Sequence, residues 1–329
     1  MGMNDTAWKL VQKMIKKQDE LKIEAIDTPV GLLIDAGVKT QGSIDAGVFI
    51  AKICMGGRGT VEQKPVEING SSFEGLFVID ETTPVLSMLG SQMAGWQIKG
   101  STIDGKKFRA LGSGPARLLA QKPKELFDYI KYKEKEDHAV LVLETSKYPG
   151  KDVFRKIADR CGMEPDAVTI IVLATNSIAN STQSAARIAE TGLHKLEVLH
   201  NPNLSYLQVI HAEGTAPIPP VHPDPMVAMG IVNDAILYGG DCLLKVKGAT
   251  DDQLREAIKL IPSSSSNQYG RPFYEIFKEA EFNFYKIDRG LFAPAKCTLE
   301  NLETGTTVYW GRINPKAIHE SFMFKKKNN

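Results

Sequence analysis

The chain has 329 residues, of which 43% are hydrophobic and 24% are charged, with 28 glycines and 17 prolines. Lysine plus arginine number 40 and aspartate plus glutamate number 39, so the formal net charge is +1. This composition excludes collagen, coiled coil and bulk disorder. Because basic and acidic residues are nearly equal in number, the chain has no overall electrostatic field that would attract nucleic acid or an anionic membrane.

Neither a secretory signal nor a membrane span is expected. Charges recur every few residues in 1–22, and no run approaches the ~20 apolar residues that span a bilayer. The four cysteines form no CxxC pair, and such scattered thiols suit a reducing compartment. We therefore expect a cytoplasmic protein, and the length predicts about two domains.

The predicted elements begin with an amphipathic helix, capped by Asn4, Asp5 and Thr6 and reaching Leu21. Short apolar runs bounded by glycine then predict strands at 31–35, 47–50 and 75–79. A helix is predicted to start at Thr83-Pro84 and to run to Trp96.

From residue 138 the pattern alternates between strand and helix. Strands are predicted at 138–143, 168–173, 204–210 and 242–246, and helices at 152–161, 181–200, 251–261 and 272–280. Such alternation indicates βαβ packing and a parallel or mixed sheet. We expect an α/β (α+β) fold of two mixed-sheet domains, residues 1–125 and 126–329, with a ligand cleft between them. One of the two domains can consist of two separate segments of the chain.

Glycine and proline concentrate in loops that are candidates for ligand binding: 55–59, 111–117, 214–220 and 238–240. In Gly112–Arg117, amides at a helix start and the Arg117 side chain would suit an anion. The loop matches neither a Walker loop nor GxGxxG, and a purely structural turn is the more common explanation.

The segment 174–183 follows a predicted strand, and seven of its ten residues are polar. Open α/β folds bind ligands outside the carboxyl ends of strands. On the next helix Arg187 and Glu190 share one face, although such a pair is usually only a weak surface ion pair. No HExxH, HxH or GxSxG pattern occurs, so we expect chemistry without a metal or a covalent nucleophile.

Over essentially its whole length the sequence resembles the methenyltetrahydromethanopterin cyclohydrolases of methanogenic archaea and methylotrophic bacteria. The motifs that carry the resemblance are 54–57, 94–96, 111–117, Ser181-Thr-Gln183 with Arg187 and Glu190, 214–217, 233–240, 269–273, 284–288 and 291–295.

The resemblance implies reversible hydrolysis of the cyclic methenyl bridge of tetrahydromethanopterin to the N5-formyl form, in one-carbon metabolism (methanogenesis or formaldehyde oxidation). It implies no cofactor, no metal and a homotrimer in the cytoplasm. Glu190 would be general base and acid on water, tuned by Arg187. The implied substrate-binding residues are Ser91, Gln92, Ser113, Arg117, Thr182, Gln183, Asn233 and Asp234.

The sequence departs from the family pattern at Ile231-Val232, at Ala174-Thr175-Asn176 and at Met93. We interpret these departures as changes in affinity or in the pterin tail accepted. Two alternatives stay open. One is a non-catalytic binder or carrier of a C1-loaded tetrahydropterin. The other is a phosphate- or nucleotide-binding enzyme that uses Gly112–Arg117.

Overall fold

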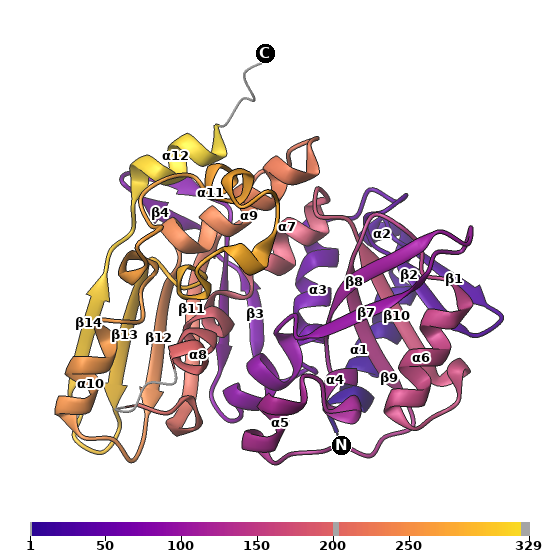
Figure 1. Ribbon diagram of the computed structural model, residues 1–329, viewed down its shortest axis with the longest axis horizontal. Coiled ribbons are helices and arrows are strands. Elements are labelled where there is room, and N and C mark those ends of the chain that lie inside the picture. Colours follow the sequence, from indigo (N-terminus) through magenta and orange to yellow (C-terminus); the bar gives the residue numbers. More distant parts are fainter. Residues whose placement is uncertain (1, 200–203, 324–329) are drawn as a thin grey trace. The chain divides into compact units, whose positions relative to one another are not determined.

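A computed structural model describes residues 2–199 and 204–323. The chain forms two compact units, which we call unit 1 (Met1–Thr60 and Thr83–Gln183) and unit 2 (Val61–Thr82 and Ser184–Asn329). Each unit is built on a six-stranded sheet flanked by helices (Figure 1). Because each sheet contains both parallel and antiparallel pairs, the prediction of a mixed α/β fold is confirmed.

The sheet of unit 1 has the order β1-β2-β10-β9-β8-β7. Its strands are β1 (Glu24–Thr28), β2 (Gly31–Asp35), β7 (Trp96–Ser101), β8 (Lys107–Ser113), β9 (Ala139–Glu144) and β10 (Val168–Leu173). The three strands β2, β10 and β9 are parallel, and the outer pairings are antiparallel. Strands β9 and β10 are apolar and buried almost throughout, as expected for parallel strands covered on both faces.

Alternate side chains of these strands face two different helix layers. Leu141 and Ile170 pack with helix α6 (Lys151–Cys161), and Val142 and Ile171 pack with helices α1 (Met3–Lys16) and α3 (Ile44–Cys54). The remaining helical segments of the unit are α2 (Gln18–Leu21), η1 (Val85–Gln92), α4 (Ala116–Ala120), α5 (Lys124–Ile130), η2 (Pro165–Ala167) and most of α7 (Ile178–Ala185).

Three predictions in unit 1 are wrong in detail. Helix α1 begins at Met3, and Asn4 does not cap it, because its amide Nδ2 donates instead to the Pro115 carbonyl at 2.8 Å. Residues 47–50 lie in helix α3 rather than a strand, since Ser43 caps a helix through the amide of Ala46. The helix after Pro84 ends at Gln92, and Trp96 begins β7.

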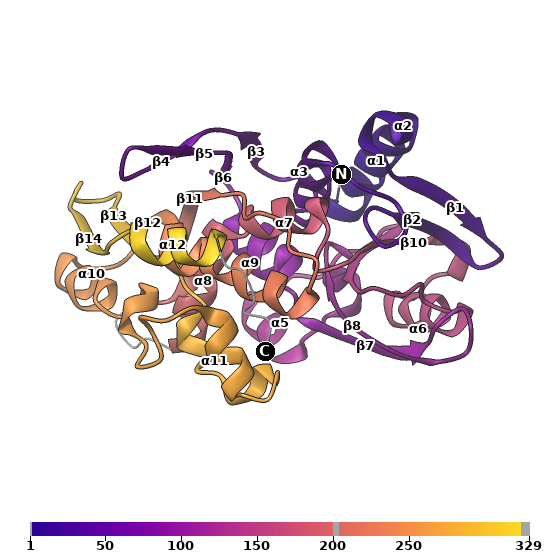
Figure 2. The same ribbon diagram turned by 90° about the horizontal axis from the view of Figure 1, so that it is seen from above.

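The sheet of unit 2 has the order β14-β13-β12-β11-β6-β3. Its strands are β3 (Thr60–Gln63), β6 (Gly75–Asp80), β11 (Val209–Pro217), β12 (Asp241–Val246), β13 (Lys296–Asn301) and β14 (Thr307–Gly311), and a hairpin of β4 (Val66–Ile68) and β5 (Ser71–Phe73) lies beside it. Figure 2 shows helix α8 (Ile188–Leu199) on one side of this sheet and the hairpin on the other.

Helices α9 (Pro225–Gly239), α11 (Phe273–Glu279) and α12 (Pro315–Phe322) pack together around Leu237, Phe273, Ile276 and Ile318. Helix α9 was not predicted from the sequence, although Asp224-Pro225 is a typical start. The Asp224 carboxylate accepts from the amide of Met226, and proline occupies the first helical position. The short helices of this unit are η3 (Tyr206–Gln208), η4 (Ser263–Ser265), η5 (Phe284–Lys286) and η6 (Arg289–Leu291).

The predicted strand at 204–210 is also wrong in its bounds. Residues 206–208 form η3, and the strand starts at Val209 and runs to Pro217. The prediction of a loop at 214–220 is therefore wrong for its first four residues. The strands predicted at 31–35, 75–79, 138–143, 168–173 and 242–246 and the helix at 152–161 are confirmed within one or two residues, and those at 251–261 and 272–280 are confirmed but shorter.

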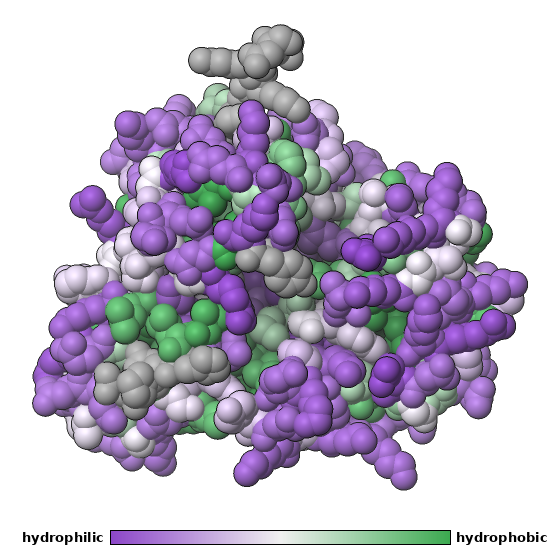
Figure 3. All heavy atoms as spheres, viewed as in Figure 1, coloured by the Kyte–Doolittle hydropathy of each residue, from purple (hydrophilic) through white to green (hydrophobic). Residues whose placement is uncertain are grey.

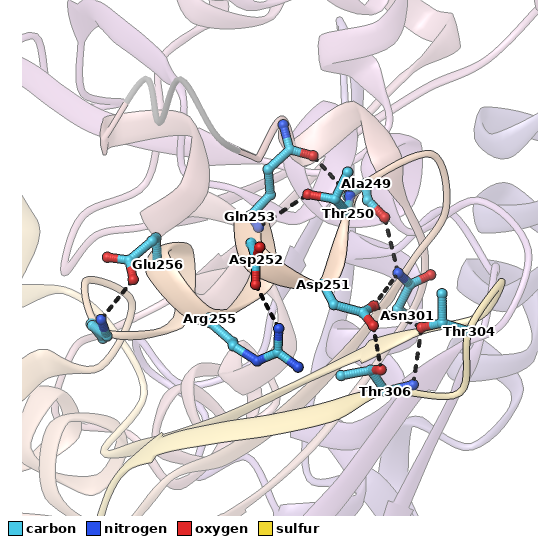
Figure 4. Close-up of polar contacts among 11 residues, drawn as sticks. Ala249, Thr250, Asp251, Asp252, Gln253, Arg255, Glu256, Asn301, Thr304 and Thr306 are labelled. Atoms are coloured by element: carbon cyan, nitrogen blue, oxygen red, sulfur yellow. Dashed lines mark hydrogen bonds and ion pairs between the residues drawn. The ribbon is translucent and has the colours of Figure 1, made fainter.

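The carboxylate of Asp251 connects helix α10 (Asp251–Ile258) to the end of β13 and the β13–β14 connection through hydrogen bonds (Figure 4). Asp251 accepts from Asn301 at 2.8 Å and from Thr304 and Thr306 at 2.7 Å each. The hydroxyl of Thr306, the largest influence, lowers the pKa of this carboxyl. Thr250 and Gln253 form a capping box at the same helix start, so local and tertiary contacts agree here.

The face of the molecule drawn in Figure 3 is mostly hydrophilic, with scattered apolar side chains. Among residues 2–199 and 204–323, no helix is both long enough and apolar enough to cross a membrane.

Candidate active site

The helix predicted over 181–200 is two helices, α7 and α8, separated by a turn at Ala186 and Arg187; His200 lies outside the described residues. The Arg187 carbonyl accepts from the amide of Thr191 at 2.9 Å, so Arg187 opens α8. Glu190 therefore lies in the first turn. A carboxylate is favoured at this end because the helix dipole is positive there.

Arg187 and Glu190 form a tight ion pair, as the spacing predicted. The guanidinium Nε lies 2.9 Å and Nη2 2.8 Å from the same carboxylate oxygen, Oε2 of Glu190. Only 19% of the Arg187 side chain and 3% of the Glu190 side chain are exposed. The pair is therefore not the exposed surface ion pair that its spacing alone would usually indicate, since burial strengthens the electrostatic interaction.

The two oxygens of Glu190 have different surroundings. Both guanidinium contacts converge on Oε2. Within the part of the chain that the structure describes, Oε1 has no hydrogen-bond partner. A carboxylate held by one oxygen keeps the lone pairs of the other available to accept a proton or to orient a water molecule.

Close packing on glycines sets the position of α8. A Cβ on Gly214 of β11 would lie 2.9 Å from Cγ1 of Ile188, and one on Gly240 would also collide with that side chain. Further along the helix, a Cβ on Gly192 would lie 2.7 Å from the sulfur of Cys242. Gly214 and Gly240, which belong to two of the candidate ligand loops, thus allow Ile188, the first residue of α8, to pack closely against the sheet.

Lys195 anchors the other side of α8. Its ammonium is buried and donates to the Gly290 carbonyl and, at 3.1 Å, to the Ser265 hydroxyl. Burial lowers the pKa of Lys195 to about 8. Sequence reasoning missed this residue because its partners lie about 70 and 95 positions away in the chain.

The predicted substrate-binding residues Ser91, Gln92, Ser113 and Arg117 are all buried in unit 1. The Ser91 hydroxyl donates to the Cys54 carbonyl at 2.5 Å. Arg117 is fully buried, and its Nη1 donates to the carbonyls of Leu89 (2.8 Å), Ser91 (3.2 Å) and Met93 (2.7 Å). Arg117 thus fixes the end of η1.

Thr182 and Gln183 lie on α7 and are buried. The Thr182 hydroxyl donates to the Ile178 carbonyl at 2.9 Å, and the Gln183 amide donates to the Asn180 side chain at 2.8 Å. A Cβ on Gly47 would collide with Thr182, so α3 and α7 approach closely.

Asn233 and Asp234 lie on α9 in unit 2. The Asn233 amide donates to the Met229 carbonyl at 2.8 Å. Asp234 is buried and accepts from the Phe273 amide (2.9 Å) and the Ser321 hydroxyl (2.7 Å), which connects α9 to α11 and α12. Burial raises the pKa of the Asp234 carboxyl to about 7. The neighbouring Ile231 and Val232 are also buried.

Polar groups that the sequence analysis did not select gather where the parallel strands of unit 1 end. Asp35, at the end of β2, accepts from the Tyr148 hydroxyl at 2.6 Å and from four successive amides, residues 37–40. Glu144, at the end of β9, accepts from the Thr175 hydroxyl at 2.5 Å. Asp35 closes the predicted strand 31–35, and Glu144 directly follows the predicted strand 138–143; these positions were a signal for the cluster.

Elsewhere in unit 1 a cavity of about 810 Å³ is lined by residues 95–99, Lys122–Glu125, Lys156, Asp159 and Arg160. None of the predicted site residues lines it, and Lys124 and Lys156 are paired with Asp128 and Asp152. Among the described residues, no group of three or more His, Cys, Asp or Glu side chains could hold a metal ion.

The chain is similar to named proteins over nearly its whole length. The family model described as Cyclohydrolase (MCH) matches residues 2–322. The methenyltetrahydromethanopterin cyclohydrolase of Methanothermobacter marburgensis is 41% identical over 328 residues, which is 98% of this chain and 99% of that protein. The enzymes of the same name from Methanococcoides burtonii (37% identity, 99% of each chain) and Methanocaldococcus jannaschii (38%, 98% of each) are also similar. The chain therefore belongs to the cyclohydrolase (MCH) family.

Proposed function

We propose that the protein hydrolyses 5,10-methenyltetrahydromethanopterin reversibly to N5-formyltetrahydromethanopterin, in one-carbon metabolism. The substrate follows from the names of relatives that align over nearly the whole chain. The observation that carries the mechanism is the buried Arg187–Glu190 pair, with Oε2 held by the guanidinium and Oε1 facing no donor among the described residues.

The chemistry requires only a positioned water molecule and a place for its proton. The methenyl bridge is an amidinium-like cation, so its carbon is already electrophilic. Glu190 takes a proton from water through Oε1 while the water oxygen bonds to the bridge carbon. The resulting carbinolamine opens when Glu190 returns that proton to N10, whose bond to carbon breaks with its electron pair left on nitrogen. The hydroxyl proton then passes to Glu190 as the formyl carbonyl forms.

Arg187 has two roles in this scheme. Its positive charge favours the ionised carboxylate that the first step needs, and its two nitrogens hold the Oε2 edge so that Oε1 points one way. A lysine at this position would offer a single ammonium and would not hold the carboxylate plane.

The other predicted site residues fall into two groups, according to the hydrogen bonds that their side chains already make within the chain. We propose that Ser91, Gln92, Ser113, Thr182, Gln183 and Asn233 contribute to substrate binding. Arg117 and Asp234, whose hydrogen bonds to the chain account for their burial, would brace η1 and α9. No cofactor or metal has a step in this scheme.

The first test mixes purified protein with methenyltetrahydromethanopterin and follows loss of the methenyl absorbance, with methenyltetrahydrofolate as a second substrate. Glu190→Gln should lower kcat by about 10²–10⁴-fold and leave KM nearly unchanged, because it removes the proton acceptor but not the substrate contacts. Glu320→Gln, on the exposed side of α12, is the matched control. Saturable binding without turnover by the parent protein would favour a carrier.

We also propose a homotrimer in the cytoplasm. On the sheet face of unit 2 opposite α8, Lys296 pairs with Asp241 (2.7 Å), Lys245 with Glu300 (3.4 Å) and His211 with Glu213 (3.0 Å). The three basic and three acidic groups of these pairs give this region a mixed charge, which suits a second copy of the chain. Light scattering coupled to size-exclusion chromatography measures the subunit number, and a mass other than that of three chains would refute the trimer.

A further inference from the structure

We propose that His194 carries the proton released in each hydrolysis from Glu190 towards Glu197 and the surface. The inference rests on the proposed function and adds a residue that the Arg187–Glu190 scheme does not contain. The observation behind this proposal is a row of titratable side chains on α8, from the buried Glu190 through His194 to Glu197, which pairs with the exposed Arg289 of η6.

The reaction must export one proton. The substrate is a cation and the formyl product is neutral at the bridge. Of the two protons of the water consumed, one ends on N10 and the other leaves as H⁺. After the carbinolamine opens, Glu190 therefore holds a proton, and it must lose that proton before it can activate another water molecule. With only 3% of its side chain exposed, Glu190 has little direct access to bulk solvent.

His194 is placed to accept this proton. It lies one helical turn after Glu190, at the i,i+4 spacing that makes side chains neighbours. Glu197 follows three residues later, with its Oε2 4.0 Å from Nε2 of His194. Exposure of the side chains increases along the row, from 3% for Glu190 to 18% for His194, 21% for Glu197 and 66% for Arg289, which pairs with Glu197 at 3.6 Å.

The electrostatics keep the imidazole ready to accept a proton. Burial, the largest influence, lowers the pKa of His194, so the ring is neutral near pH 7. The charges that act on it are the carboxylates of Glu190 and Glu197, which favour the imidazolium, and the guanidiniums of Arg289 and Arg187, which oppose it. A proton arriving from Glu190 thus creates an imidazolium beside Glu197. Because 4.0 Å separates Nε2 from Oε2 of Glu197, the second ring nitrogen releases its proton to a water molecule, which can pass it to Glu197.

The transfer balances without another reagent. The O–H bond of the Glu190 carboxylic acid breaks and an N–H bond forms on one imidazole nitrogen. The N–H bond on the other nitrogen then breaks, and its proton goes to water, which can pass it to Glu197 or buffer. Glu190 returns to the carboxylate and His194 to the neutral ring, so both are ready for the next turnover.

The test uses His194→Gln, which keeps a polar side chain but cannot transfer a proton, and His319→Gln, on the exposed side of α12, as matched control. In His194→Gln, rapid mixing with substrate should show a burst of about one product per active site, followed by a steady rate about tenfold or more below the parent. Added imidazole at constant ionic strength should restore the steady rate in this variant and have little effect on the parent and on His319→Gln.

A structural role for His194 predicts a different result, namely that the first turnover slows as much as the later ones and imidazole restores nothing. That outcome, or a steady rate within about twofold of the parent, would overturn the relay. Glu197→Gln provides a second variant, in which a smaller, buffer-dependent loss is expected. If the parent protein itself fails to hydrolyse the substrate, the proposed function fails, whereas the relay alone fails if the parent is active and His194→Gln is equally active.

Discussion

The seating of α8 on Gly214 can be tested by adding a single methyl group. In Gly214→Ala the new Cβ would lie 2.9 Å from Cγ1 and 3.0 Å from Cγ2 of Ile188, and 2.9 Å from the Asp241 carbonyl. These distances are about 0.5 Å or more shorter than a comfortable contact of ~3.5 Å. The Asp241 carbonyl belongs to the neighbouring strand and cannot move far, so Ile188 and the start of α8 must shift.

We expect Gly214→Ala to lower the free energy of unfolding by about 1–3 kcal/mol, the usual cost of overpacking a core. Because Ile188 immediately follows Arg187, the shift should also lower kcat, by about 10²-fold if the carboxylate of Glu190 moves by about 1 Å. Urea unfolding followed by circular dichroism measures the first effect, and the methenyl assay measures the second.

A double-mutant cycle with Ile188→Ala isolates the contact. Ile188→Ala alone should cost about 2–5 kcal/mol because it leaves a cavity. The methyl of Gly214→Ala would then occupy part of that cavity, so the double variant should be more stable than the sum of the single losses by about 1 kcal/mol or more. Strict additivity, or a Gly214→Ala protein as stable and active as its parent, would refute the idea that this contact seats α8.

Three further predictions concern buried polar groups. Because burial raises the pKa of Asp234 to about 7, the folded protein binds more protons than the unfolded chain between about pH 4 and 7. The free energy of unfolding of the parent, relative to that of Asp234→Asn, should therefore fall as the pH rises through that window and level off above it. Urea midpoints measured at successive pH values test this prediction. Burial lowers the pKa of Lys195 to about 8, so between about pH 8 and 10 the unfolded chain binds more protons than the folded protein. The free energy of unfolding of the parent should therefore increase relative to that of Lys195→Met as the pH rises. A difference that stays constant with pH would contradict this prediction. Arg117→Met removes the donors to the carbonyls of Leu89, Ser91, Met93 and Lys122 and should lower the free energy of unfolding by about 3–5 kcal/mol. Arg117→Lys should recover less than half of this loss, because an ammonium lacks the planar fork that lets Nε reach the Lys122 carbonyl while Nη1 serves the others; full recovery by lysine would show that a positive charge alone suffices.

The sequence by itself was enough for most of the secondary structure and for the Arg187–Glu190 pair. The buried segments 139–143 and 168–173 are continuous runs of aliphatic and β-branched residues of typical strand length, which favours a strand covered on both faces. The i,i+3 spacing of Arg187 and Glu190 depends only on helix geometry, so it too could be derived locally. The catalytic role that we propose for this pair rests on the whole-chain resemblance, because the same spacing is common on exposed helices.

Only the tertiary structure decided what the less regular segments do. The apolar run 47–50 is compatible with either a strand or a helix, and Ser43 together with packing against α1 selects the helix. The break at Ala186 and Arg187 carries no proline or glycine signal. Gly214 and Gly240 lie in segments that the sequence indicates as candidate ligand loops, but in the structure both pack against the side chain of Ile188. Arg117 was a candidate for binding an anion, but its guanidinium donates to main-chain carbonyls. The partners of these residues lie far away in the sequence, and burial of a polar group or close approach of two backbones is a property of the folded chain, which local patterns do not specify.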